Sequence, residues 1–336
     1  MNSTSRLQLF RRLSLFGAVL ALCVVVLGAW VRLNDAGLGC PDWPGCYGHI
    51  SAGAAEQNLD IAQGMYPNRK FEYAKAVKEM IHRYFASTLG LVIVSLGLLA
   101  YWNRREPDQP VKVPLLLIPL VLLQGMLGMW TVTLLLKPLI VVSHLIGGLT
   151  TMSLLAWQSM RVERSVETSA DANLKVVALI GLIVTALQIF LGGWTSTNYA
   201  AVSCPDFPTC QASFWPQMDM KDAFVLWRGL GIDYEGGVLN HPARVAIHFV
   251  HRLGAVTTAI VLASVALMAW IRGHTRSIKL AGIAIGGALL LQLVVGPLMV
   301  MKGFPLWLAT AHNAVAAILL LCVVRLNRLV WVCKES

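Results

Sequence analysis

Residues 27–30 read LGAW and residues 40–46 read CPDWPGC, and the second half of the chain repeats this order with LGGW at residues 191–194 and CPDFPTC at residues 204–210. Each matched position, from the first glycine to the last cysteine, is separated from its counterpart by 164 residues without a gap. Self-similarity at a fixed spacing is the mark of an internally duplicated chain. The sequence therefore predicts two structurally related halves.

The duplication continues into segments that carry histidine. IHR at residues 81–83 matches VHR at residues 250–252, and a second pair of matched histidines stands later in each half. The four matched histidines are His82, His144, His251 and His312. We expect each half to carry one of them on its second helix and one on its fourth.

A smaller motif, glutamine followed four residues later by glycine, recurs on three predicted helices. The pairs are Gln124 with Gly128, Gln188 with Gly192 and Gln292 with Gly296. Small residues let transmembrane helices approach closely, and amide side chains hydrogen-bond between helices. We interpret these pairs as helix-packing features.

The composition places the chain in a membrane. Of its 336 residues, 57% are hydrophobic and 13% charged, which leaves too little polar surface for a soluble domain. A helix needs about 20 apolar residues to cross a hydrocarbon core of roughly 30 Å. Such runs occur at residues 13–33, 80–102, 113–135, 138–160, 174–195, 246–271, 277–300 and 305–326. We expect an all-α integral membrane protein with eight transmembrane helices, the first of them retained rather than cleaved as a signal peptide.

Basic residues indicate how these helices are oriented. An even number of spans puts both termini on one side, and nearly all of the formal net charge of +10 lies in the segments on that side. The positive-inside rule therefore predicts a multi-pass protein of the cytoplasmic (inner) membrane with both termini in the cytoplasm. Because topology alone requires basic residues in these segments, nucleic-acid binding is disfavoured.

Two long loops then lie outside the cytoplasm and carry four of the seven cysteines. Disulfides persist in that oxidising compartment. The economical pairing joins Cys40 to Cys46 and Cys204 to Cys210. Beyond the cysteine motifs, residues 47–78 and 211–245 share no evident pattern. We predict two pseudo-symmetric four-helix bundles, residues 1–165 and 166–336, whose diverged loops suggest two sites with different tasks.

All four matched histidines are predicted to lie in the first turns below the extracytoplasmic surface. Ionisable residues are costly inside a span, so a symmetric set of four constitutes a candidate site. Two imidazoles from facing helices, without a duplicated cysteine or carboxylate at the same level, suit bis-histidine haem iron better than tetrahedral zinc. The alternative is four separate hydrogen bonds between helices, which would use the same costly side chain four times.

Arg83 and Arg252 directly follow the first histidine of each half. Near the membrane surface, a guanidinium could clamp a haem propionate with two hydrogen bonds. It could equally extend to the lipid headgroups. Both interpretations stay open at this point.

The halves differ three residues before these histidines. Glu79 precedes His82, whereas His248 precedes His251, and an i, i+3 spacing puts both partners on one helix face. A carboxylate at the edge of a low-dielectric pocket could accept protons or stabilise a cation developing on a substrate. The alternative is a solvated glutamate at a helix N-terminus.

Together, EMIHR at residues 79–83, the other three matched histidines and the paired CPDWPGC and CPDFPTC loops resemble the haem A synthase family, membrane enzymes that oxidise haem O to haem A for terminal oxidases. The resemblance covers essentially the whole chain. It implies that the N-terminal bundle receives haem O between His82 and His144, and that the C-terminal bundle retains haem b between His251 and His312. It also implies a catalytic role for Glu79.

The resemblance further implies the reaction, in which the C8 methyl group of haem O is hydroxylated stepwise and a gem-diol loses water to leave a formyl group. Each step removes two electrons, so an electron acceptor is required. Candidate partners are the farnesyltransferase that forms haem O and oxidase assembly factors. The Cys40–Cys46 pair beside the substrate site could be a structural clip, which we favour, or a redox-active bridge.

Two other functions would use parts of the same pattern. A dihaem b protein that passes electrons to or from quinone would need the same four ligands, but it has no need for a carboxylate in one site only. A transporter would place its special residues near the bilayer midplane rather than near one surface. The sequence leaves open whether His241 or His248 has a role.

Overall fold

The computed structural model describes residues 3–67, 69–106, 108–160 and 171–331, and over these residues it is helical, without a strand. Eight of its helices are long and apolar enough to cross a bilayer, which confirms the predicted number. They are α1 (Ser3–Leu33), α4 (Tyr73–Trp102), α5 (Lys112–Thr133), α6 (Pro138–Ser159), α7 (Ala172–Thr197), α9 (His241–Arg272), α10 (Arg276–Met301) and α11 (Leu306–Trp331). The shorter α2 (Ala52–Gln57), α3 (Leu59–Met65), η1 (Ala201–Ser203) and α8 (Met220–Ala223) lie in the connections. The predicted boundary between residues 165 and 166 lies outside the described residues.

Two helices begin well before their apolar runs. α4 begins at Tyr73 rather than near residue 80, and α9 begins at His241 rather than near residue 246. The start of α9 is set by Asn240, whose side chain accepts a hydrogen bond of 2.9 Å from the backbone N–H of Ala243. The added turns are polar, so hydropathy does not detect them. As a result, the predicted ligands on both helices lie two or more turns inside the helix.

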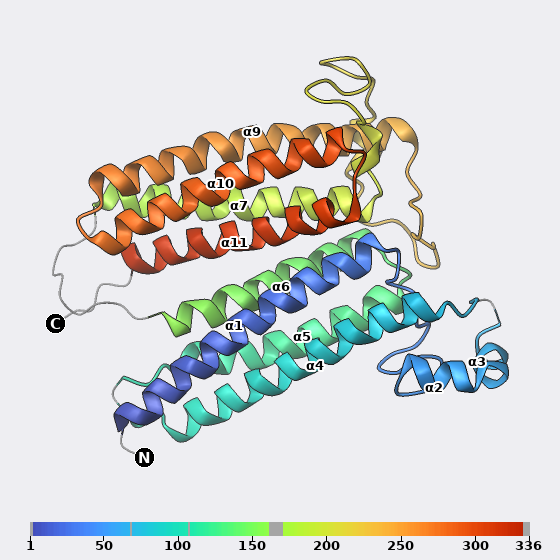
Figure 1. Cartoon of the computed structure of the whole chain (residues 1–336), viewed down its shortest axis with the longest axis horizontal. Helices are drawn as coiled ribbons and strands as arrows, with labels where there is room; N and C mark the ends of the chain where they lie inside the picture. Colours follow the sequence, from blue (N-terminus) through green and yellow to red (C-terminus); the bar gives the residue numbers. More distant parts are fainter. Residues whose placement is uncertain (1–2, 68, 107, 161–170, 332–336) are drawn as a thin grey trace.

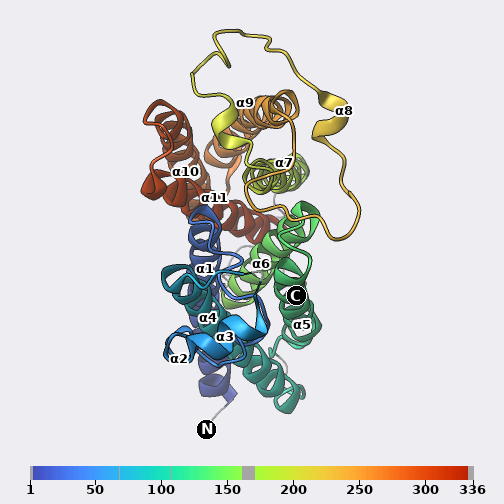
Figure 2. The same cartoon turned by 90° about the vertical axis from the view of Figure 1, so that its right-hand side faces the viewer.

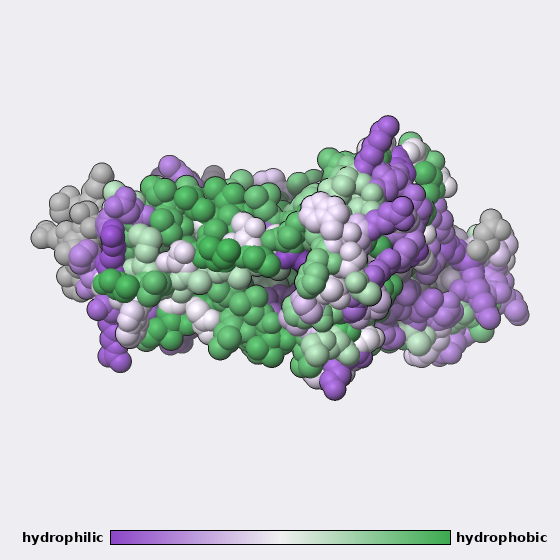
Figure 3. All heavy atoms as spheres, turned by 90° about the horizontal axis from the view of Figure 1, so that it is seen from above, coloured by the Kyte–Doolittle hydropathy of each residue, from purple (hydrophilic) through white to green (hydrophobic). Residues whose placement is uncertain are grey.

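All eight long helices run in roughly the same direction as the longest axis of the molecule. In Figure 1, α1 begins and α11 ends at one end of the molecule, whereas α2, α3 and the loops of the second half gather at the other end. Figure 3 shows a broad hydrophobic surface over the helices, with hydrophilic residues concentrated at the end that carries the loops. This arrangement is that of a multi-pass membrane protein.

The helices pack mainly within each half of the chain. α1 and α5 each contact α4 and α6, while α7 and α10 each contact α9 and α11. Contacts of α1 with α11 and of α6 with α7 join the two groups, which lie one above the other in Figures 1 and 2. The first group buries Ile93, Leu117 and Met152, and the second buries Leu262 and Ile285.

The ends of α1 and α7 repeat the same local structure. The side-chain amide of Asn34 donates to the backbone carbonyl of Trp30 at 2.7 Å, and that of Asn198 donates to Trp194 at 2.9 Å. Each asparagine is followed by a residue with positive φ that ends the helix. The sequence duplication is therefore a duplication of structure at these helix ends.

Equivalent residues of the two halves also touch each other. The hydroxyl of Tyr199 donates to Asp35 at 2.9 Å, and the guanidinium of Arg32 donates to the backbone carbonyl of Ser196 at 2.8 Å. The members of both pairs are 164 residues apart, which is the spacing of the repeat. Equivalent positions of two related units meet only near the axis that relates them. The ends of α1 and α7 therefore lie beside a local pseudo-two-fold axis.

Candidate functional site

A glycine lies opposite each of the four matched histidines. A Cβ atom added to these glycines would lie 3.0–3.5 Å from the Cε1 atom of the facing imidazole. The pairs are Gly28 with His82, Gly128 with His144, Gly192 with His251 and Gly296 with His312. Contacts at this distance leave little room for a side chain, so each glycine gives the imidazole its place between the helices.

The histidines are brought together in pairs within each half. His82 on α4 lies close enough to His144 on α6 for their charges to interact, and the same holds for His251 on α9 and His312 on α11. The Nδ1 atoms of His82 and His144 are buried without a hydrogen-bond partner. Within the described residues, no three His, Cys, Asp or Glu side chains form a group suited to a metal ion. A pair of imidazoles without a third Cys, His, Asp or Glu ligand suits haem iron better than a tetrahedral metal site, and in the first pair both Nδ1 atoms are free of protein partners in the described part of the chain.

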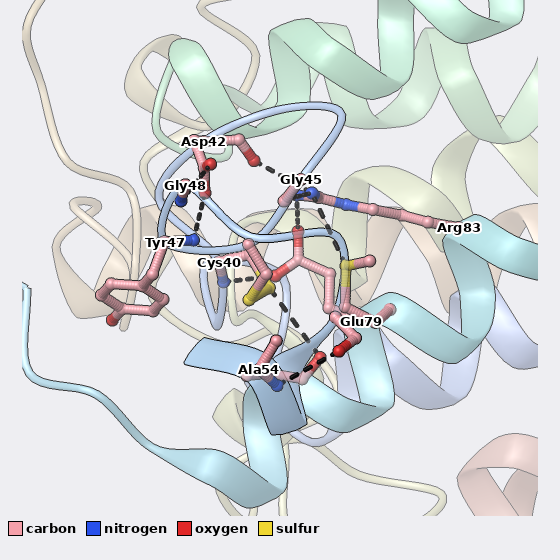
Figure 4. The surroundings of a disulfide bond; sticks show 12 residues. Cys40, Asp42, Gly45, Tyr47, Gly48, Ala54, Glu79 and Arg83 are labelled. Atoms are coloured by element: carbon pink, nitrogen blue, oxygen red, sulfur yellow. Dashed lines mark hydrogen bonds and ion pairs between the residues drawn. A yellow bond between two sulfur atoms is a disulfide. The ribbon is translucent and has the colours of Figure 1, made fainter. Parts of the chain in front are cut away.

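Glu79 is the acidic residue nearest in sequence to His82, and its side chain is buried. Only 5% of the residue is exposed. Its carboxylate accepts hydrogen bonds from the backbone N–H of Cys40 at 2.9 Å and from the guanidinium of Arg83 at 2.5 Å (Figure 4). The alternative of a solvated glutamate at a helix N-terminus is therefore wrong, because α4 begins at Tyr73 and the loop covers the carboxylate.

Both disulfides predicted from the sequence are present, Cys40 with Cys46 and Cys204 with Cys210. In the first loop, Arg83 extends into the turn and donates to the backbone carbonyls of Asp42 at 2.9 Å, Pro44 at 3.3 Å and Gly45 (Figure 4). The guanidinium therefore holds the loop onto α4.

The second loop is held in the same way. Arg252 donates to the backbone carbonyls of Thr209 at 2.8 Å, Cys204 at 2.9 Å and Asp206 at 2.9 Å. The sequence analysis missed this role, although a guanidinium at the same position of both repeats was a signal for it. Contacts of Arg83 and Arg252 with haem propionates stay a prediction.

The aspartates of the two cysteine motifs shape the loops from within. Asp42 accepts from the backbone N–H groups of Tyr47 and Gly48, at 2.6 and 2.9 Å. Asp206 accepts at the same distances from the equivalent Gln211 and Ala212. A hydrogen bond from the Thr209 hydroxyl, with these amides, lowers the pKa of Asp206 to about 2. The motif residues thus form a compact turn, a role that the sequence analysis did not assign.

The second half replaces the buried carboxylate with an imidazole. His248 is 4% exposed, and its Nε2 atom lies 3.3 Å from Nε of Arg252. His241, the other histidine without a predicted role, contacts the side-chain amide of Gln211 at the surface. The difference between Glu79 and His248 therefore places a buried acid beside the first histidine pair and a buried base beside the second.

The loop of the second half reaches across to the first half. Arg69 forms ion pairs with Asp233 at 2.8 Å and with Glu235 at 3.2 Å. The backbone N–H of Tyr234 donates to the carbonyl of Leu135 at 3.1 Å. Except for Leu135, these residues lie in the segments 47–78 and 211–245, which show no repeat, so the sequence offered no signal for this contact.

Lys137 of the first half also binds the loop of the second half. Although it is charged, only 2% of it is exposed, and its ammonium group donates to the carbonyl of Gly229 at 2.6 Å. The ammonium also lies 3.8 Å from the ring centroid of Trp227. Burial lowers the pKa of this lysine, and the carbonyl and the aromatic face are the groups that offset the cost of burial.

Comparison with known sequences identifies the family. Residues 11–324 match the family of cytochrome oxidase assembly proteins. A haem A synthase of Shewanella oneidensis is 42% identical over 93% of this chain and 94% of its own length. Haem A synthases of Methylobacterium radiotolerans and Rhizorhabdus wittichii are 29% and 26% identical, over 93% and 90% of this chain and 88% of their own lengths. The chain belongs to the haem A synthase family. The resemblance seen in the sequence is thereby confirmed.

The family match extends over both halves. It includes the four matched histidines, the buried Glu79 and both disulfide loops. Family membership gives no support to a transporter or to a dihaem electron-transfer protein. The two histidine pairs are therefore candidate haem sites of a haem A synthase.

Proposed function

We propose that this protein is an oxidoreductase that converts haem O into haem A, by oxidising the C8 methyl group to a formyl group in successive hydroxylations. The observation that carries the proposal is a duplicated arrangement of half-buried histidine pairs in which, among the described residues, the position three residues before the first histidine is a buried carboxylate in one half and a buried imidazole in the other. Relatives that align with more than nine-tenths of the chain are named haem A synthases, which supports it.

The two halves are proposed to divide the work. His82 and His144 would hold the substrate haem O, and His251 and His312 would hold a resident haem b. When bound, haem b would supply a one-electron redox centre within the membrane. The helix packing supports a division into two halves, because the long helices mainly contact others of their own half. Two sites of the same architecture can then carry different haems.

Glu79 is the residue proposed to act on the substrate. It lies three residues before His82 on α4, so both side chains leave the same face of the helix. Arg83 and the Cys40 amide orient the carboxylate. A fixed carboxylate in a pocket that excludes water can stabilise positive charge developing at the oxidised methyl carbon. The two electrons removed in each step pass to an electron acceptor.

The disulfides are proposed to be structural. Both loops have the same bridge and the same arginine clamp, although only the first loop lies beside Glu79. A redox role confined to the substrate site would not require the second copy. The loops are instead expected to close the extracytoplasmic ends of the two bundles.

The proposed location is the cytoplasmic membrane, with both termini in the cytoplasm. The basic residues of the cytoplasmic segments support this orientation, and the substrate has a farnesyl-derived tail that suits entry from the lipid. Haem O would come from the farnesyltransferase that forms it. The product would pass to factors that assemble the oxidase.

The proposal is tested by producing the chain together with a haem O-forming enzyme, extracting the haems and separating them by chromatography. Haem A is expected in the extract, and it should be absent when the haem O-forming enzyme is produced alone. An extract with only haem b and unconverted haem O would contradict the proposal. It would leave the dihaem electron-transfer protein as the better interpretation.

A further inference from the structure

The histidines of the C-terminal pair each contact a glutamine amide. The Nε2 atom of Gln188 lies 3.1 Å from Nδ1 of His251 and also donates to the backbone carbonyl of the same residue at 3.1 Å. The Nε2 atom of Gln292 lies 3.2 Å from both ring nitrogens of His312, Nδ1 and Nε2. Each glutamine stands four residues before the glycine that faces the same imidazole. The glutamine, the glycine and the histidine therefore form one repeated unit.

The structure leaves space for these amides and leaves them incompletely satisfied. A Cβ at Gly254 would lie 2.3 Å from Oε1 of Gln188, so a side chain there would displace the amide. The Oε1 atoms of Gln188 and Gln292 are buried without a hydrogen-bond partner among the described residues. A half-turn of the terminal torsion exchanges the oxygen and nitrogen of an amide. It would bring each oxygen within reach of Nδ1, and at Gln188 it would replace the hydrogen bond to the His251 backbone carbonyl with one from Nδ1–H.

An oxygen at that place has a specific chemical use. A histidine that ligates a metal is neutral, and it commonly donates its other ring N–H to an acceptor, which fixes both tautomer and ring orientation. We propose that Gln188 and Gln292 are positioning residues. Their side-chain oxygens accept hydrogen bonds from the Nδ1–H groups of His251 and His312, which leaves Nε2 of each imidazole to bind haem iron. This inference rests on the proposed function only in taking these two histidines as haem ligands.

The N-terminal pair is not supported by glutamine amides, and His82 has a backbone hydrogen bond with Val24 in place of one. Val24 stands at the place of the glutamine for His82. Gln124 has the equivalent place for His144, but its Nε2 atom and the Nδ1 atom of His144 are both buried without a partner in the described structure. The amide of Gln124 lies against Gly147, three residues after His144, just as the amide of Gln188 lies against Gly254, three residues after His251. Fixed ligands suit a cofactor that stays, and less constrained ligands suit a substrate haem that must leave.

The test uses purified full-length protein that carries haem b. Gln188→Met and Gln292→Met remove the acceptor at similar side-chain length, and Gln124→Met is the matched control in the other half. We expect transfer of haem b to a haem-scavenging protein to become about 10- to 100-fold faster in the first two variants. Their midpoint potential should rise, since a histidine without its acceptor donates less charge to ferric iron. The control should change neither quantity.

A variant with the opposite expected effect on the midpoint potential keeps the inference testable if a methionine variant fails to fold. Gln188→Glu places a stronger acceptor at Nδ1 and should lower the potential below that of the unchanged protein. Unchanged haem release and potential in folded Gln188→Met and Gln292→Met would overturn the inference. So would an unchanged potential in Gln188→Glu, or equal effects of Gln124→Met. Because these readouts concern haem b alone, they stay interpretable even if no haem A is formed, which would instead refute the proposed function.

Discussion

A glycine faces each of the four matched histidines, and the imidazole occupies the space that a side chain would fill. The sequence analysis predicted these histidines because their duplication was visible without a structure. It interpreted the glycines only as packing features, since a sequence does not show which ring a glycine faces. The contact with histidine gives those glycines a more specific role than close helix packing.

Filling one of these spaces tests that role. In Gly296→Val, the added atoms would collide with the imidazole of His312, because a Cβ alone lies 3.3 Å from its Cε1 atom. Overpacking of this kind costs about 1–3 kcal/mol, so we expect the retained haem b to fall by roughly tenfold. The haem content of the purified protein measures the effect. Gly287→Val on the same helix is the control, because nothing lies within 4 Å of its Cβ position.

Removing the charge of Glu79 separates chemistry from haem binding. Glu79→Gln can still hydrogen-bond with its surroundings, so we expect the protein to fold and to bind both haems. Haem A formation should fall by about 100-fold, the usual scale for the loss of one group that stabilises charge in the transition state. The haem A yield per protein measures the loss. Glu72→Gln, at the exposed start of the same helix, should leave the yield unchanged, and full yield from Glu79→Gln would remove this residue from the mechanism.

At the scale of elements, the number of transmembrane helices was predictable and their beginnings were not. Apolar runs define the membrane-crossing part of α4 and α9, but the first turns of both helices are polar. The start of α9 depends on the Asn240 cap, and that of α4, which has no side-chain cap, depends on contacts with the loop. The hydrogen bonds from Arg83 and Arg252 to the disulfide loops (the arginine clamp) could not be predicted for a similar reason. Whether Arg83 points toward lipid or into the loop depends on the loop's fold, which the CPDWPGC motif does not reveal by itself.

The clamp predicts that each arginine protects its own disulfide. Arg83→Lys replaces a branched guanidinium with a single ammonium group, so most of the carbonyl contacts at residues 42–45 should be lost. A hydrogen bond to a charged group contributes about 1.5–3 kcal/mol, and loss of one such bond should speed reduction of Cys40–Cys46 by about tenfold or more. Thiol labelling and mass spectrometry measure the rates. The Cys204–Cys210 bridge serves as the internal control, and equal acceleration of both bridges would argue against the clamp.

At the scale of the whole molecule, the duplication was predictable and its asymmetry only partly so. The difference between Glu79 and His248 is visible in the sequence, and it indicates two unlike sites. The crossing of the second loop onto Arg69, Leu135 and Lys137 was not predictable, because the contact joins segments without repeat or motif. The second half therefore contributes structure to the extracytoplasmic surface of the first.

Loss of the contacts between Lys137 and the second loop should make that loop more accessible to protease. Lys137→Met removes the hydrogen bond to Gly229 and the cation–π contact with Trp227. We expect trypsin to cleave after Arg228 several-fold faster in this variant, since a buried hydrogen-bonded charge contributes about 1.5–3 kcal/mol. Peptide mapping measures the rate. Lys302→Met, at an exposed site in another loop, is the control, and unchanged cleavage in Lys137→Met would show that other contacts hold the loop.

The division of the molecule into a substrate half and a cofactor half is tested most directly by the haems retained in His82→Ala and His251→Ala. Both variants are purified from cells that also form haem O, and their haems are separated by chromatography. The account predicts that His82→Ala keeps haem b but yields no haem A, whereas His251→Ala loses haem b. Loss of the same haem from both variants, or loss of haem b from His82→Ala alone, would contradict it.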